Sequence, residues 1–139
     1  MADIRLDDGA KNNGLAGMMT DLIRQNISNH PGRDKVFRAM KGNVVLVAKD
    51  IDVSLTLEFS PDGMVAYDGV KPPYSLKIET DSDNILKLST LKIKAGLPYY
   101  FDKTGREVLG MLFKRRLRIN GLFAHPLLLT RLTKLFSVY

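Results

Sequence analysis

The feature that most constrains the fold is an alternating segment at residues 51–60, which reads Ile-Asp-Val-Ser-Leu-Thr-Leu-Glu-Phe-Ser. Apolar residues occupy every second position from Ile51 to Phe59, and polar residues fill the positions between them. Because the side chains of a strand point alternately to its two faces, this pattern predicts a strand with one face buried and the other in water. The rest of the chain must then cover the apolar face.

The sequence around this segment predicts the rest of a sheet. Residues 44–48 form a β-branched run, and the Lys49-Asp50 turn would join it to residues 51–60 as a hairpin. Residues 64–68 follow a turn that contains Pro and Gly, and residues 74–79 alternate again. Residues 113–120 alternate as well, with Phe113, Leu117 and Ile119 expected to face inward before an Asn-Gly turn. We therefore expect five strands.

Helical spacing predicts the covering layer. Apolar residues recur every three or four positions in 15–29, and a shorter helix is expected at 33–41, capped by Gly42. Polar caps at 80–83 and 102–104 predict two further helices. His125-Pro126 opens a last helix, which is more apolar than a surface helix and must either lie in the core or cover a ligand.

These elements predict an α+β fold in which a five-stranded, largely antiparallel sheet has its helices packed on one face. Residues 1–14 carry three aspartates and no apolar core, so we expect a flexible polar tail rather than a signal peptide. Residues 15–139 would form one domain. No apolar run has the length of a membrane span, and the chain has no cysteine, which together predict a soluble protein of the reducing cytoplasm.

Positive charge is concentrated near the C-terminus. Residues 103–139 contain eight Lys and Arg against one Glu, whereas residues 1–102 are close to neutral. A local positive field suits phosphate, coenzyme A, anionic lipid or nucleic acid, and it is equally compatible with a solvated face that keeps the protein soluble. Nucleic acid is the least favoured of these partners, because no stacking-aromatic motif accompanies the charge.

Several segments resemble the sterol carrier protein 2 family. They are Gly42-Asn-Val-Val-Leu, Val53-Ser-Leu-Thr-Leu-Glu-Phe, Pro61-Asp-Gly, and Leu117-Arg-Ile-Asn-Gly before the final apolar helix. The resemblance implies a lipid tunnel between sheet and helices that holds fatty acids, acyl-CoA, sterols or other isoprenoids without catalysing a reaction. The segment Phe113-Lys-Arg-Arg-Leu117 is also similar to the branch that serves as an accessory factor in quinone biosynthesis. The alternative function is therefore a scaffold subunit that acts through protein contacts or homodimerisation.

A lipid chain needs an apolar cavity with few unpaired polar groups. Candidate wall residues, which would otherwise pack a dry core, are Phe37, Leu57, Phe59, Leu88, Val108, Leu112, Leu128, Leu132 and Phe136. Arg115 falls on the inward face of its predicted strand and would hold an acidic head group, or else reach solvent and pair with Asp102 or Glu107. Lys114, Arg116 and Arg118 on the open face are candidates for docking an anionic membrane or a partner protein.

We predict no catalytic residue, metal or cofactor. His30 and His125 each precede a proline at a helix boundary, which favours a structural role over general base catalysis. Residues 105–110 have the glycine spacing of a phosphate-binding loop, but Met111 and Leu112 stand where Lys and Ser or Thr are required. Asp81 and Asp83 lack the other ligands of a calcium loop and are expected to cap a helix.

Overall fold

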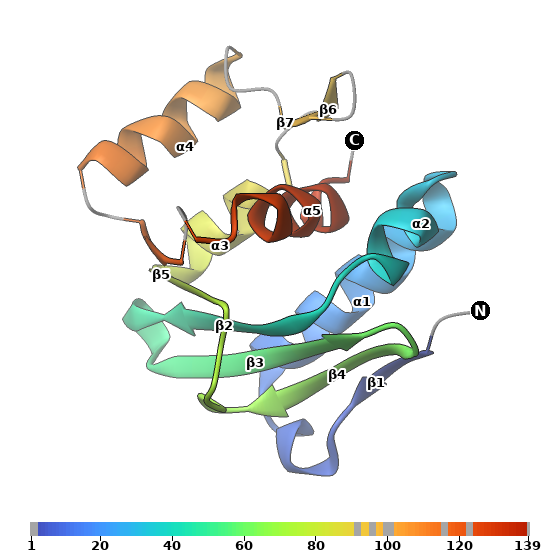
Figure 1. Cartoon of the computed structure of the whole chain (residues 1–139). Coiled ribbons are helices and arrows are strands. Elements are labelled where there is room, and N and C mark those ends of the chain that lie inside the picture. The colour runs from blue at the N-terminus through green and yellow to red at the C-terminus, as the bar shows by residue number, and fades with distance from the viewer. Residues whose placement is uncertain are drawn as a thin grey trace.

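A computed structural model describes residues 3–90, 93–94, 97–98, 102–114, 117–121 and 124–138, with the backbone alone at 93–94, 97–98 and 112–113. The described residues form a main sheet, a second, two-stranded sheet, and helices (Figure 1). The strands are β1 (Asp3–Leu6), β2 (Gly42–Ala48), β3 (Val53–Ser60), β4 (Gly63–Asp68), β5 (Leu76–Thr80), β6 (Ile93–Lys94), β7 (Leu97–Pro98) and β8 (Arg118–Asn120). The α-helices are α1 (Gly14–Asn29), α2 (Arg33–Arg38), α3 (Ser82–Leu88), α4 (Lys103–Phe113) and α5 (Pro126–Phe136), and 3-10 turns lie at Asp8–Ala10 and Lys49–Ile51.

Among the described residues, the main sheet has six strands in the order β1-β4-β3-β2-β5-β8. β2, β3 and β4 form an antiparallel meander, whereas β5 runs parallel to β2, and β1 runs parallel to β4. The register places Val44 opposite Leu57 and Leu46 opposite Leu55, so that both strands direct their apolar residues to one face. The predicted α+β fold with a largely antiparallel sheet is confirmed, with one strand more than expected.

The additional strand corrects our expectation of a flexible tail before residue 15. β1 pairs with β4, and its Ile4 and Leu6 are half-buried against the core. Ala10 is fully buried, and the Asn13 side chain caps α1 by accepting the Ala16 N–H at 3.0 Å. Asn13 also donates to the Ser54 carbonyl at 2.9 Å. The segment is polar because β1 is a short edge strand, and the Ile4 and Leu6 alternation was its only sequence signal.

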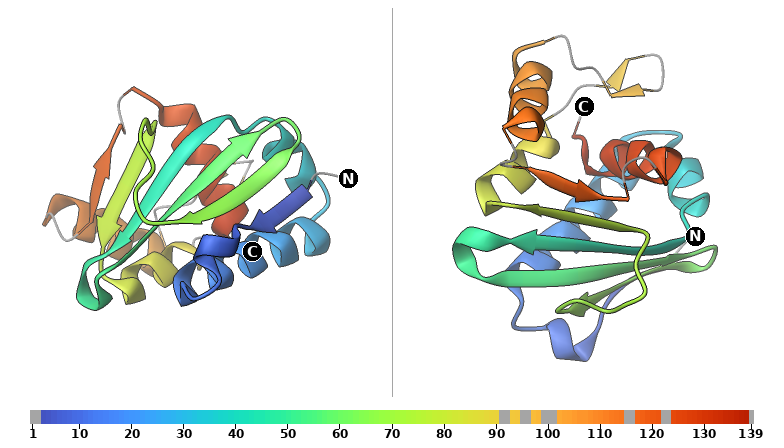
Figure 2. Two further views of the ribbon diagram at one scale, coloured as in Figure 1. Left: turned by 90° about the horizontal axis from the view of Figure 1, so that it is seen from below. Right: turned by 60° about the vertical axis from the view of Figure 1, so that its left-hand side comes forward.

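Helices α1, α2 and α5 lie on one side of the sheet and pack against one another (Figures 1 and 2). The stripe expected in the last helix is buried, as is the inner face of α1. The buried faces of α1 and α5 are formed by Leu15, Ala16, Met19, Ile23, Leu128, Leu132, Leu135 and Phe136. α5 thus lies in the core with one long face, while Leu127 points away from it and is 68% exposed.

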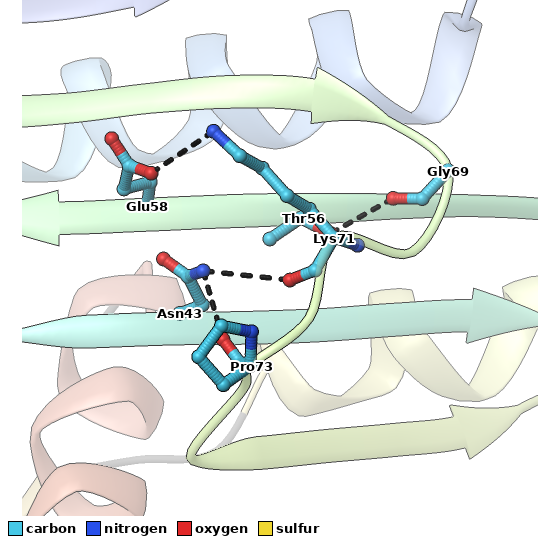
Figure 3. A network of polar contacts seen from close by, with 6 residues as sticks. All are labelled: Asn43, Thr56, Glu58, Gly69, Lys71 and Pro73. Carbon is cyan, nitrogen blue, oxygen red and sulfur yellow. Dashed lines mark hydrogen bonds and ion pairs between the residues drawn. The ribbon is translucent and has the colours of Figure 1, made fainter.

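The other face of the sheet is not simply open to water. The connection from β4 to β5 crosses β3 and β2 on that face (Figure 3). The Thr56 hydroxyl donates to the Gly69 carbonyl at 2.8 Å and accepts the Lys71 N–H at 2.9 Å, and the Asn43 amide donates to the Pro73 carbonyl at 3.0 Å. Val45 and Thr56 are fully buried beneath this connection. The alternation at residues 51–60 correctly assigned Thr56 to this face, but it gave no sign of a loop that returns over it.

Several predicted boundaries are wrong. Ile51 lies in a 3-10 turn and is 51% exposed, because Asp52 takes a left-handed conformation before β3 begins. Gly42 opens β2 with a positive φ of 105° instead of capping α2. Phe113 ends α4, so the expected strand at 113–120 is confined to Arg118–Asn120. The apparent alternation at 113–120 arose because the apolar residue at the end of α4 is followed closely by the apolar residues in and before the short strand β8.

Candidate functional site

The structure describes the side chains of eight of the nine predicted apolar wall residues, and all eight are buried in one hydrophobic core. The eight residues are Phe37, Leu57, Phe59, Leu88, Val108, Leu128, Leu132 and Phe136. Leu112 lies in α4 with its side chain outside the described set, and Arg115 and Arg116 lie outside the described residues. Lys114 and Arg118 are exposed.

The buried residues differ in depth. Phe37 of α2 and Phe59 of β3 are almost fully enclosed, and their rings meet edge to face with centroids 6.2 Å apart. Such a contact stabilises the core beyond the area that it buries. By contrast, Leu88, Val108 and Leu128 retain 6% to 9% exposure. The predicted wall therefore divides into a tightly packed part and a part close to the surface at α3, α4 and α5.

An open hollow of about 600 Å³ lies between α3 and α4 beside this shallower part. Its lining consists of Asn84, Lys87, Lys103, Arg106, Glu107, Gly110, Met111 and Lys114. Met111 is a core residue with an edge in the hollow, and sequence reasoning missed it although it follows Val108 at helical spacing. The hollow thus combines an apolar floor with a strongly basic rim.

One ion pair crosses this hollow. The Lys87 ammonium lies 2.7 Å from a Glu107 carboxylate oxygen. The hydrogen bond from Lys87, the positive charge of Lys87 and then that of Lys103 lower the pKa of Glu107. Glu107 is therefore ionised at neutral pH, and the pair holds the middle of α4 against α3.

Two smaller hollows lie elsewhere and each touches one predicted residue. One of about 330 Å³ lies between β1, α1 and α2 and includes Phe37, with Ile4 and Ile27 as further apolar lining. Another of about 360 Å³ lies at the start of α5 and includes Leu128, with the exposed Leu127 and Arg131 at its edge. The predicted residues are therefore distributed over more than one hollow.

The C-terminal end of α5 is fixed by polar side chains from α1 and α2. The buried Asn26 amide donates to the Leu135 carbonyl at 2.8 Å, and the Arg33 guanidinium donates to the carbonyls of Lys134 and Ser137. Burial lowers the pKa of Arg33, which remains charged and opposes the negative end of the helix. The sequence did not reveal this contact, because the partners are about a hundred positions apart.

No group of three or more metal-ligating side chains occurs within the part of the chain that the structure describes. His30 contacts the Val138 carbonyl at 2.9 Å, and His125 stands just before α5. Of the helices in the described ranges, none has both the length and the apolar composition needed to cross a membrane.

Comparison with known proteins identifies the fold. No protein-family model and no curated protein matches the sequence. The structure is similar to a UbiJ-SCP2 ubiquinone synthesis protein, with a TM-score of 0.61 at 12% identity over 88% of this chain and 96% of that one. A crystal structure of sterol carrier protein 2 gives 0.53 at 13% identity, covering 87% of this chain and 92% of that chain. Sterol carrier protein 2 from Yarrowia lipolytica, in its apo form, gives 0.53 at 13% identity over 94% and 95%.

Proposed function

We propose, from the sterol carrier protein 2 fold of this chain, that it is a non-enzymatic lipid-binding or lipid-transfer domain. Its ligand would be a fatty-acyl, sterol-like or isoprenoid chain held between the sheet and the helices. The observation that carries the proposal is that Met111 belongs to the same buried core as Leu88 and Val108 and also lines the hollow between α3 and α4. An apolar chain that enters there meets core side chains instead of water.

The predicted wall residues remain our proposed lipid contacts. We expect Leu88, Val108 and Leu128 to meet the ligand first, because they are the least enclosed of the described set. The deeper residues, such as Leu132 and Phe136, would back them. Leu112 and Arg115 are kept as candidates on sequence grounds, Arg115 for an acidic head group. The cytoplasm is the compartment that we propose.

Displacement of a fluorescent fatty acid tests the proposal. The purified protein should bind the probe at micromolar concentration, and fatty acids and isoprenoid alcohols should displace it. Val108→Asp places a carboxylate in the apolar layer and should weaken binding at least about tenfold, because a buried charge is costly. Lys35→Glu, on the exposed surface of α2, is the control. A protein that binds no probe and carries no lipid in native mass spectrometry would refute the proposal.

A scaffold role is the second candidate. One of the similar structures is titled a ubiquinone synthesis protein, and Leu127 is exposed beside the cationic Arg131 at the start of α5. A second copy of the chain, or a partner enzyme, would cover such a residue. Sizing chromatography of the protein and of Leu127→Asp tests this role. A monomer in both cases would argue against homodimerisation through α5.

Docking to an anionic membrane through Lys114, Arg116 and Arg118 is a separate proposal, and a vesicle-binding assay would test it.

A further inference from the structure

We propose that the hollow between α3 and α4 is a binding site for a phosphate or diphosphate group, carried by the lipid ligand. This inference concerns the head group of the ligand. It rests on the proposed function, because it requires that the buried core binds the apolar chain of the same ligand. Helices α3 and α4, whose side chains line the hollow, lie at the end of the molecule where α4 stands away from the sheet (Figure 1).

One face of α4 lines the hollow. The lining residues of this helix lie at positions 103, 106, 107, 110 and 111, and Lys114 follows directly after its end, with its N–H donating to the Gly110 carbonyl at 3.0 Å, so that each position lies three or four residues from another. Side chains at this spacing share one side of a helix. The hollow is therefore not an accidental gathering of loop residues, and α4 presents a continuous face to it.

The charge of this face is unbalanced. Lys87 is neutralised by Glu107, which is the only carboxylate among the described lining residues. Within the described part of the chain, Lys103, Arg106 and Lys114 form no ion pair with a carboxylate. Three such cations around one hollow suit a multiply charged anion, and they exceed what a single fatty-acid carboxylate would neutralise.

Gly110 is the second, independent observation. A glycine inside a helix costs about 1 kcal/mol relative to alanine. A Cβ added at Gly110 would meet nothing within 4 Å, so packing within the described protein does not require glycine there. Gly110 lies in the centre of the α4 face that lines the hollow. Its missing side chain keeps open the space that a phosphate group would occupy.

Met111 connects this space to the buried core that is proposed to bind the lipid chain. Met111 lines the hollow and also belongs to the core, next to Val108 on the same helix. An amphiphile with its phosphate among the cations would thus place its chain over Met111 towards Leu88 and Val108. The geometry points to a phosphorylated or diphosphorylated lipid of the acyl or isoprenoid class.

Calorimetric titration with three probes tests the proposal. Dodecyl phosphate carries both chain and anion, dodecan-1-ol carries the chain alone, and inorganic pyrophosphate carries the anion alone. We expect dodecyl phosphate to bind at least about tenfold more tightly than dodecan-1-ol, with an advantage that falls as salt is added. Equal affinities would overturn the phosphate site while leaving lipid binding intact.

Two variants locate the site. Lys103→Glu reverses a charge at the first residue of α4, where an acidic residue favours the helix, and should remove the advantage of dodecyl phosphate. Gly110→Leu should fill the hollow and weaken dodecyl phosphate at least about tenfold while raising helix stability. The matched controls are Lys35→Glu, and Gly17→Leu in α1, where an added Cβ also meets nothing. Equal losses in the controls would overturn the assignment.

The remaining outcomes separate the sources of phosphate. Pyrophosphate binding that Lys103→Glu abolishes, with no affinity for either dodecyl probe, would confirm the anion site and refute the proposed lipid function. Binding to vesicles that contain phosphatidylglycerol, lost in Lys103→Glu and without any affinity for soluble dodecyl phosphate, would show that this face docks a membrane and would overturn the proposal.

Discussion

At the scale of single residues, Gly121 shows how a turn that is legible in the sequence depends on a distant contact. It follows β8 with a positive φ of 91°, and a Cβ there would lie 2.1 Å from the Ser75 carbonyl oxygen. A left-handed conformation alone disfavours other residues by about 1–2 kcal/mol. The backbone of the segment before β5 adds a clash that a side chain cannot avoid.

Gly121→Ala should therefore lower the free energy of unfolding by at least about 2 kcal/mol, measured by urea denaturation. Gly17→Ala is the matched control, because this glycine lies inside α1 and a Cβ added to it would meet nothing within 4 Å. The control should be neutral or stabilising by up to about 1 kcal/mol. Similar effects of the two substitutions would show that the contact with Ser75 is not rigid.

The Asn120-Gly121 dipeptide was enough to predict the turn, but Ser75 as its neighbour was not predictable. The same holds for Asp50, which the sequence indicates only as a turn residue. In the structure its carboxylate accepts the Ser82 N–H at 2.8 Å and the Ser82 hydroxyl at 2.7 Å, and thereby caps α3. The expected local cap, Asp81, makes no such side-chain bond. Local patterns specify that a helix needs a cap, and only the tertiary fold decides which residue provides it.

This cap predicts a pH dependence. The hydrogen bond from the Ser82 hydroxyl, followed by that from the Ser82 backbone N–H, lowers the pKa of Asp50 in the folded protein. A lowered folded pKa means that the stabilisation is complete above the ordinary Asp pKa of about 3.9 and is lost as the pH falls through the lowered value. The stability difference between the protein and Asp50→Asn should thus be constant from neutral pH to about pH 5 and shrink in more acidic solution.

Chemical denaturation at a series of pH values measures this difference. Asp81→Asn, which removes the same charge from a residue whose side chain makes no capping bond, is the control. A difference between the protein and Asp50→Asn that grows on acidification would contradict the assignment of Asp50 as the cap.

At the scale of elements, the position of α5 depends on contacts with α1 and α2. Its apolar stripe was predictable from period alone, and the structure buries all of it. The polar end of the helix was not predictable, since Asn26 and Arg33 approach from α1 and α2. Buried polar side chains that hydrogen-bond to a helix end do not recur at a regular spacing, so a periodic pattern in the sequence does not reveal them.

Asn26→Ala should therefore destabilise the fold by about 1–3 kcal/mol, because the Leu135 carbonyl loses its buried donor. Gln25→Ala is the control, since this neighbouring amide lies exposed on the same helix and should change stability by less than about 0.5 kcal/mol. Urea denaturation measures both. If the two variants were equally stable, the contact between Asn26 and α5 would not contribute to the fold.

The candidate site was likewise only partly predictable from the sequence. Val108 and Leu112 were legible as the apolar side of α4, and Val108 is indeed buried. The other face, with Lys103 and Arg106, reads as an ordinary solvated surface until α3 is placed beside it. Lys114 was assigned to a strand because the alternation at 113–120 hid the end of the helix. The sequence therefore predicted the buried apolar side of α4 more fully than the basic hollow.

At the scale of the whole molecule, the earlier and later parts of the chain contribute different features of the structure. Residues 3–80 provide five of the six strands of the main sheet together with α1 and α2. The hollow at α3 and α4 and the concentration of positive charge belong to the later part of the chain. A ligand that joins α3, α4 and the core would then stabilise the fold as a whole, because binding to the native state alone shifts the unfolding equilibrium.

This linkage gives the last prediction. A lipid at about one hundred times its dissociation constant should add about 2.7 kcal/mol to the free energy of unfolding. For a chain of this size, that corresponds to a rise of roughly 10 °C in the unfolding midpoint. Thermal denaturation with and without fatty acid measures the rise, which should persist in Lys35→Glu and shrink in Val108→Asp at the same lipid concentration. If a lipid that displaces the fluorescent probe left the midpoint unchanged, it would bind the unfolded chain equally well, and no folded cavity would be needed to explain its binding.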